Sequence, residues 1–126
     1  MFSHIMLGAD DVEASKKFYD AALGALGVRP GRVDPKGRAM YVHEGSIFML
    51  TQPIDGQPTT HANGSTYGFT AATPEAADAF HKAGVAAGGT AVEDAPGWRE
   101  GAGMRLYLAY LRDPSGNKIC AMCREA

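Results

Sequence analysis

The chain has 126 residues, of which 45% are hydrophobic and 21% charged, and its formal net charge is −2. This make-up is typical of a single globular domain, and the interspersed charges lack the basic patch expected of a nucleic-acid-binding protein. No apolar run approaches the roughly 20 residues of a membrane span, and the start lacks the regions of a secretory signal, so we expect no membrane partner.

The first half of the chain predicts a strand, a helix and three short strands. Residues 1–9 alternate as a strand with two largely apolar faces. A helix is predicted over residues 10–27, because Asp10 and Glu13 have the spacing of a capping box and Gly27 follows the last apolar position. Three strands are then expected, over residues 28–34, 38–44 and 46–52.

The pattern starts again after residues 53–64, which form a connection rich in Pro, Gly, Asn and Thr. A strand is predicted from residue 65. The helix that follows has Thr73 as its N-cap and Pro74 at its first position, and a double glycine ends it. The last three strands are expected near residues 90–94, 104–112 and 117–123.

The two halves match at an offset of 62 residues. Five identities come from the start, the core face and the end of the two predicted helices: Glu13 with Glu75, Ala14 with Ala76, Phe18 with Phe80, Ala21 with Ala83 and Gly27 with Gly89. Two amphipathic helices of equal length can match in this way, but the order of elements repeats as well. We therefore predict one domain over residues 1–126, with module one at 1–52 and module two at 65–126.

A tandem βαβββ repeat of this length resembles the vicinal oxygen chelate superfamily, which includes glyoxalase I, extradiol dioxygenases, fosfomycin-resistance enzymes and bleomycin-resistance proteins. The segments "HIMLGADDVEASKKFYDAALGALG" and "YLRDPSGNKI" carry the resemblance, and the two-module layout covers essentially the whole chain. The resemblance implies an α+β fold whose modules form a curved mixed sheet, with half-barrels around a cup. It also implies a homodimer, and it leaves the reaction open, because this scaffold hosts many activities.

Metalloenzymes of the superfamily hold a divalent ion with four side chains, typically His and Glu. His4 lies 14 residues before Phe18 and matches the first ligand position. The resemblance puts the other three positions at Met49, at Phe69 (or Tyr67 if the register slips by two) and at Cys120, seven residues after Asp113. Met and Phe are not ligands for hard divalent ions, so we expect no cofactor; His4 and Cys120 enter a metal site only if a divergent one exists.

Without a metal, the cup can still bind a small organic molecule. Met and aromatic side chains that share the parity of the four inherited positions are predicted to form its walls or to fill the core: Phe2, Met6, Met49, Tyr67, Phe69 and Met122. Trp98 and Arg105 lie in or beside a glycine-rich stretch, and with Tyr107 they are candidates for the rim of the cup or for the end of the core.

Cys120 and Cys123 are the only cysteines and have the C-x-x-C spacing of zinc sites and thiol redox centres. Two cysteines three positions apart cannot staple a secreted fold, so we expect a cytoplasmic protein. Residues three apart on a strand point to opposite faces, which argues against a joint thiol site. We place Cys120 toward the cup.

Three functions are thus weighed. The first is a glyoxalase/bleomycin-resistance-like protein that binds a small molecule in a largely apolar cup without a metal. The second is a glyoxalase-like lyase or isomerase with an altered metal site that includes His4, although His4 is equally well explained as a hydrogen-bonded core histidine. The third is a thiol redox or zinc-stapled protein that uses Cys120 and Cys123. No motif of a nucleophilic hydrolase or a nucleotide site is present.

Overall fold

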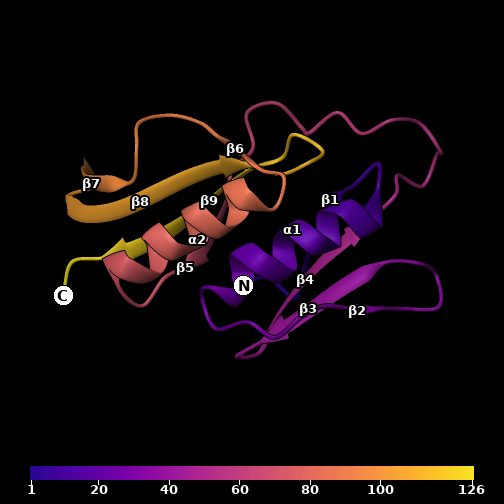
Figure 1. Cartoon of the computed structure of the whole chain (residues 1–126), viewed down its shortest axis with the longest axis horizontal. Helices are drawn as coiled ribbons and strands as arrows, with labels where there is room; N and C mark the ends of the chain where they lie inside the picture. Colours follow the sequence, from indigo (N-terminus) through magenta and orange to yellow (C-terminus); the bar gives the residue numbers. More distant parts are fainter.

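The computed structural model describes all of residues 1–126 and confirms the α+β class (Figure 1). The first module contains β1 (Ile5–Gly8), α1 (Val12–Gly24), β2 (Arg32–Val33), β3 (Ala39–His43) and β4 (Ser46–Thr51). The second contains β5 (Tyr67–Thr70), α2 (Pro74–Ala86), β6 (Thr90–Ala91), β7 (Gly97–Gly101), β8 (Met104–Arg112) and β9 (Lys118–Arg124).

The strands form two mixed sheets, one in each module, and neither sheet closes into a barrel. The first sheet has the order β1-β4-β3-β2, and the second has the order β5-β9-β8-β6 with β7 also paired to β8. In each sheet the strand before the helix is parallel to the last strand of its module, β1 to β4 and β5 to β9. All other pairs are antiparallel.

The 62-residue repeat predicted from the helices is present in the structure. Both ends of α1 and α2 are separated by this offset, and so are both ends of β1 and β5. The second module departs from the first by one extra strand, β7, in the glycine-rich stretch where no strand was predicted. β7 forms because it pairs with β8 over five residues, a tertiary contact that local propensity does not reveal.

Several element ends differ from their predicted positions. The N-cap of α1 is Asp11, whose carboxylate accepts from the Ala14 amide at 3.0 Å, and not Asp10. Asp10 is engaged elsewhere, because its carboxylate accepts two hydrogen bonds from Thr59 at 2.8 Å each. The N-cap of α2 is Thr73 with Pro74 next, as predicted. The strands predicted over 28–34 and 90–94 shrink to two residues each.

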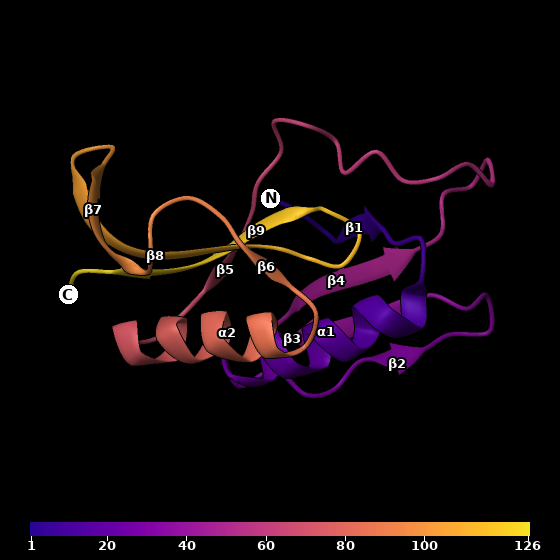
Figure 2. The same ribbon diagram turned by 45° about the horizontal axis from the view of Figure 1, so that its top comes forward.

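The core lies between the helices and one face of the two sheets. The helices pack against each other, α1 also on β4 and α2 on β8 and β9 (Figure 2). We call the covered side of the sheets the helix face; its buried residues include Leu7, Tyr41, Phe48 and Leu50 in the first sheet and Ala109, Leu111, Ile119 and Ala121 in the second. The opposite side is the far face. Both helices are too short to cross a membrane.

Candidate functional site

The residues predicted to line one cup lie on both faces of the sheets. Met6 pairs with Met49 in the register of β1 and β4, next to the core residues Leu7 and Phe48, so both methionines lie on the far face. Cys120 and Met122 alternate with the core residues of β9 and are also on the far face. These four side chains therefore all lie on the far face, two on each sheet.

Tyr67 and Phe69 are on the helix face. β5 pairs with β9 so that Tyr67 is opposite Ile119 and Phe69 opposite Ala121, and both aromatic rings pack against the core. The residue opposite Cys120 is Gly68, whose missing side chain leaves room beside the sulfur. The alternation along β5 is thus shifted by one residue from the expected one.

Trp98, Arg105 and Tyr107 form a stack on the helix-face side of the second sheet. The rings of Trp98 and Tyr107 meet edge to face at 5.3 Å, and the Arg105 guanidinium lies 4.7 Å from the Trp98 ring centre. The Tyr107 hydroxyl donates to the carboxylate of Asp78 on α2 at 2.6 Å, and this hydrogen bond raises the pKa of Tyr107 to about 12. The stack therefore belongs to the β8–α2 contact.

His4 precedes β1 by one residue and is exposed. Its Nδ1 is hydrogen bonded to the Ser3 hydroxyl at 2.8 Å. His4 is not the buried core histidine that was one alternative; it borders a cavity that it shares with Tyr67 and Phe69.

The residues present do not fit the divalent-metal site of the superfamily. No group of three His, Cys, Asp or Glu side chains in the structure, around His4 or elsewhere, is placed to hold a metal ion. The position 62 residues after His4 is Thr66, and Phe69 lies on the opposite face from Cys120. The four predicted positions thus offer the imidazole of His4, the thioether of Met49, the phenyl ring of Phe69 and the buried thiol of Cys120, which is not a ligand set for a hard divalent ion.

The two thiols are separated as strand geometry predicts. Cys120 pairs with Tyr110 on the far face, whereas Cys123 is part of the core on the helix face. Each is only 6% exposed, and burial raises the pKa of the Cys120 thiol. A buried thiol with a raised pKa lacks the thiolate character of a redox centre.

A cavity of about 450 Å³ lies between β1 and β5, at the end of α1; we call it the first cavity. Its size is within the range of about 300–1,000 Å³ that holds small ligands. Eleven of its 18 lining residues are hydrophobic. The lining consists of Phe2, Ser3, His4, Ile5, Leu23, Leu26, Val28, Tyr41, His43, Glu44, Ser46, Ile47, Phe48, Tyr67, Gly68, Phe69, Thr70 and Ala72.

Three aromatic rings from three strands form the inner wall of the first cavity. The ring centre of Phe48 lies 5.2 Å from that of Phe69, edge to face, and 5.9 Å from that of Tyr41. The polar groups include His43 and Glu44 at the β3–β4 turn, with 3.7 Å between His43 Nε2 and Glu44 Oε1. The wall can therefore accept an apolar ring while imidazole and carboxylate groups offer hydrogen bonds.

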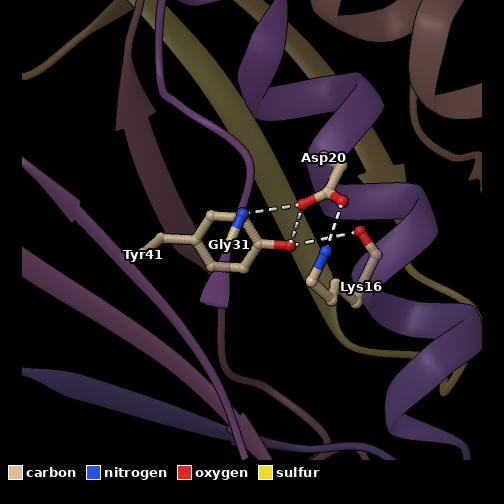
Figure 3. A network of polar contacts seen from close by, with 4 residues as sticks. All are labelled: Lys16, Asp20, Gly31 and Tyr41. Carbon is tan, nitrogen blue, oxygen red and sulfur yellow. Dashed lines mark hydrogen bonds and ion pairs between the residues drawn. The ribbon is translucent and has the colours of Figure 1, made fainter. Parts of the chain in front are cut away.

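A polar network fixes the Tyr41 side chain in this wall (Figure 3). The Tyr41 hydroxyl donates to Asp20 Oδ1 at 2.8 Å and to the Lys16 carbonyl at 3.1 Å. Asp20 also accepts from the Gly31 amide at 2.9 Å and from Lys16 Nζ at 2.8 Å. Burial would raise the pKa of Asp20, but the hydrogen bonds from Lys16, Gly31 and Tyr41 outweigh it and lower the pKa. The ring is thus tied to α1.

A second cavity, of about 550 Å³, lies below the connection between β4 and β5, which arches away from the helices (Figure 2). The two hydrogen bonds from Thr59 to Asp10 anchor this connection at the start of α1. Only five of the 14 lining residues are hydrophobic. The lining consists of Met6, Leu7, Gly8, Thr51, Pro53, Ile54, Asp55, Pro58, Thr59, Thr60, His61, Ala62, Tyr67 and Asn117.

Sequence reasoning did not predict Tyr41, Phe48 or His43 as cavity residues. Tyr41 lies between half-buried Met40 and exposed Val42, and Phe48 lies in a buried run with Met49 and Leu50; both patterns indicate core residues and nothing more. Tyr41 and Phe48 line a cavity because residues of β1 and β5, which come from different modules, lie beside them. That arrangement depends on how the two modules pack, and no local signal encodes it.

The sequence matches the model of one protein family. The profile of the family described as "Glyoxalase-like domain" matches residues 4–122. A search of curated proteins gave no significant match. The structure is similar to that of a glyoxalase/bleomycin resistance protein from Albidiferax ferrireducens, with 59% identity, a TM-score of 0.93, and 97% of this chain and 98% of that chain covered.

More distant structures share the fold. One is a putative glyoxalase from Bacillus halodurans, with 21% identity, a TM-score of 0.75, and 97% of this chain and 94% of that chain covered. Another is a glyoxalase/bleomycin resistance protein/dioxygenase family enzyme from Burkholderia phytofirmans, with 21% identity, a TM-score of 0.72 and 95% of each chain covered.

Proposed function

Because the chain belongs to the glyoxalase-like family of the vicinal oxygen chelate superfamily, we propose that it binds a small, largely apolar organic molecule in the first cavity. We propose that this molecule binds without the divalent ion that metalloenzymes of the superfamily hold. The aromatic wall of the first cavity carries it: Tyr41, Phe48 and Phe69 line a space of about 450 Å³.

The chemistry of the lining supports this choice of ligand. Flat aromatic walls bind apolar rings through edge-to-face and offset contacts. His4, Ser46 and Thr70 add hydrogen-bonding groups around the apolar surface. A small number of polar groups in a mainly apolar pocket is the usual composition of a small-molecule site.

The test is a calorimetric titration with 2-naphthol, an uncharged aromatic probe, in the presence of EDTA. Ala72→Trp places a large side chain at the lining of the first cavity, and Ala86→Trp places the same side chain on an exposed position of α2 outside both cavities. We expect binding to the wild type and to Ala86→Trp, and at least about a tenfold loss in Ala72→Trp, equivalent to about 1.4 kcal/mol. Equal affinities for all three proteins would contradict the proposal.

Titrations with added metal ions distinguish metal-free binding from a lyase or isomerase that uses an altered metal site. The titration is repeated after adding Zn²⁺, Ni²⁺ or Mn²⁺, and with His4→Ala in parallel. Binding that is unchanged by these ions supports the metal-free proposal. Binding that requires an ion, and is lost in His4→Ala, would instead support the altered metal site.

We also propose that the protein forms a homodimer through the far face of the first sheet. Met6 is 38% exposed and Val42 55% exposed on this face, and no helix covers them. A second copy is a partner that would remove this apolar surface from water. Light scattering should give twice the mass of the 13.3 kDa chain, and Val42→Lys should shift it toward the monomer. A wild type that is monomeric at all concentrations would rule out this interface.

A further inference from the structure

The two cavities lie end to end along the gap between β1 and β5. Along β1, Ile5 lines the first cavity and the next three residues, 6–8, line the second. Along β5, the order is reversed: Tyr67 lines both cavities, and residues 68–70 line the first alone. The two edge strands therefore run past the same pair of cavities in opposite directions.

Tyr67 is the one residue that the two linings share. Its backbone lies at the start of β5, directly after the connection that contributes part of the second cavity's lining. The Tyr67 side chain is half-buried and packs against the core, and the two cavities adjoin at this residue. We call the two adjoining cavities, which share Tyr67, the junction groove.

The two ends of the junction groove differ in chemistry. The first cavity offers the aromatic wall of Tyr41, Phe48 and Phe69. The second offers hydroxyl, amide and imidazole groups in a lining with few hydrophobic residues: Thr51, Thr59, Thr60, His61 and Asn117. Such groups bind hydroxyl- or amide-rich parts of a ligand, since each can donate or accept.

The charges in the junction groove limit the ligand further. Neither lining contains a Lys or an Arg, and the only carboxylates are Glu44 in the first cavity and Asp55 in the second. A carboxylate or phosphate on the ligand would meet these acids without a guanidinium or ammonium partner. An anionic ligand is therefore disfavoured over an uncharged one.

From this arrangement we infer that the ligand is an uncharged two-part molecule, with an apolar ring in the first cavity and a hydroxyl- or amide-rich part under the connection, beyond Tyr67. The inference rests on the proposed function of the first cavity and adds the second cavity as a specificity site. Thr60 and His61, which contribute no wall to the first cavity, are then specificity-determining residues.

The experiment compares 2-naphthol, 2-naphthyl β-D-glucopyranoside, methyl β-D-glucopyranoside and 2-naphthyl β-D-glucuronide by calorimetry. The naphthyl glucoside should bind at least about tenfold more tightly than 2-naphthol, because hydrogen bonds in the second cavity add to the ring contacts. The methyl glucoside should be the weakest of the uncharged probes. The glucuronide should bind more weakly than the glucoside, because its carboxylate lacks a cationic partner.

Two matched variants locate the sugar part. Thr60→Trp fills the second cavity, whereas Gln57→Trp places the same side chain on the same connection outside both linings. Thr60→Trp should reduce the affinity for the naphthyl glucoside to that for 2-naphthol and leave 2-naphthol unchanged. Gln57→Trp should change neither affinity.

The outcomes distinguish this inference from the proposed function. Suppose that 2-naphthol binds and the glucoside binds no more tightly, or that Thr60→Trp weakens the binding of both probes equally. Either result would overturn the inference of a two-part ligand but leave the proposed binding site in the first cavity intact. If the glucuronide binds more tightly than the glucoside, the uncharged class is overturned. If none of the naphthyl probes binds, the proposed function fails together with the inference.

Discussion

Tyr41 belongs at once to the core, to a polar network and to the wall of the first cavity. Its ring is buried next to Phe48, and its hydroxyl reaches α1 through Asp20. A strand was predicted over residues 38–44, but which of its faces meets the core, and so the burial of Tyr41, was not predicted. The network was not predictable, because its members come from residues 16, 20, 31 and 41, which only the packed structure brings together.

Gly31 allows the close approach of the Tyr41 ring. A Cβ at this position would lie 2.6 Å from Tyr41 Cζ, so Gly31→Ala must displace the ring. We expect a loss of about 1–3 kcal/mol in the free energy of unfolding, from overpacking. Gly24→Ala is the matched control, since nothing lies within 4 Å of its Cβ and alanine favours the last turn of α1. Urea denaturation measures both; equal stability of the two variants would contradict the close contact.

Asp20 makes stability depend on pH in a defined direction. Its pKa is lowered in the folded state, so its contribution is complete above the unfolded-state value of about 3.9 and is lost as the pH falls through the lower folded-state pKa. We therefore expect the wild type to lose more of its free energy of unfolding between about pH 5 and pH 3 than Asp20→Asn does. Urea midpoints at the two pH values measure the difference, and the same loss in both proteins would argue against the network.

Among the elements, the "DPSGN" turn between β8 and β9 has a larger role than a hairpin connection. The Asp113 carboxylate accepts from the Ser115 and Asn117 amides at 2.9 Å each, which closes the turn. It also accepts from the Tyr19 hydroxyl on α1 at 2.7 Å, and the Asn117 side chain donates to the Gly8 carbonyl of β1 at 2.8 Å. The turn of the second module is thus hydrogen bonded to the first module.

Asp113→Ala tests this link between the modules. The Tyr19 hydroxyl is fully buried and loses its acceptor, and the turn loses the hydrogen bonds from the Ser115 and Asn117 backbone amides and from the Asn117 side chain. We expect a loss of about 3 kcal/mol in the free energy of unfolding, because buried donors are left unpaired. Tyr19→Phe removes only the hydroxyl and should cost less. Denaturation followed by near-ultraviolet circular dichroism measures both variants, and a change below about 0.5 kcal/mol in Asp113→Ala would contradict the link.

The order of elements could be predicted from the sequence, whereas their edges and registers could not. Helix positions follow from caps and apolar spacing, as the Thr73 cap shows, and the repeat follows from them. Asp10 shows a limit of predicting helix caps from sequence. It has the spacing of an N-cap residue, but its carboxylate instead accepts hydrogen bonds from Thr59 in the connection between β4 and β5. Phe69 shows a second limit of prediction from sequence. The pairing of β5 with β9 determines on which face of the sheet the Phe69 side chain lies, and a register shift of one residue would move it to the other face.

At the scale of the whole molecule, the candidate site lies where the two repeats meet. Neither module encloses the junction groove alone, because β1 and β5 come from different halves of the chain. The sequence predicted a ligand site without the usual metal ligands, and this stays a prediction; His4, Met49 and Cys120 are a poor donor set for a hard divalent ion. The groove could not be predicted, because residues of both modules line it.

The most direct test of the central claim is an amide chemical-shift map of ¹⁵N-labelled protein titrated with 2-naphthol in the presence of EDTA. If the ligand binds in the first cavity without a metal, the amides of Ser46, Gly68 and Thr70 should show saturable shifts. Amides on α2 such as Lys82, outside both cavities, should not shift. Shifts confined to other surfaces, or shifts that appear only after a divalent metal is added, would contradict metal-free binding in the first cavity.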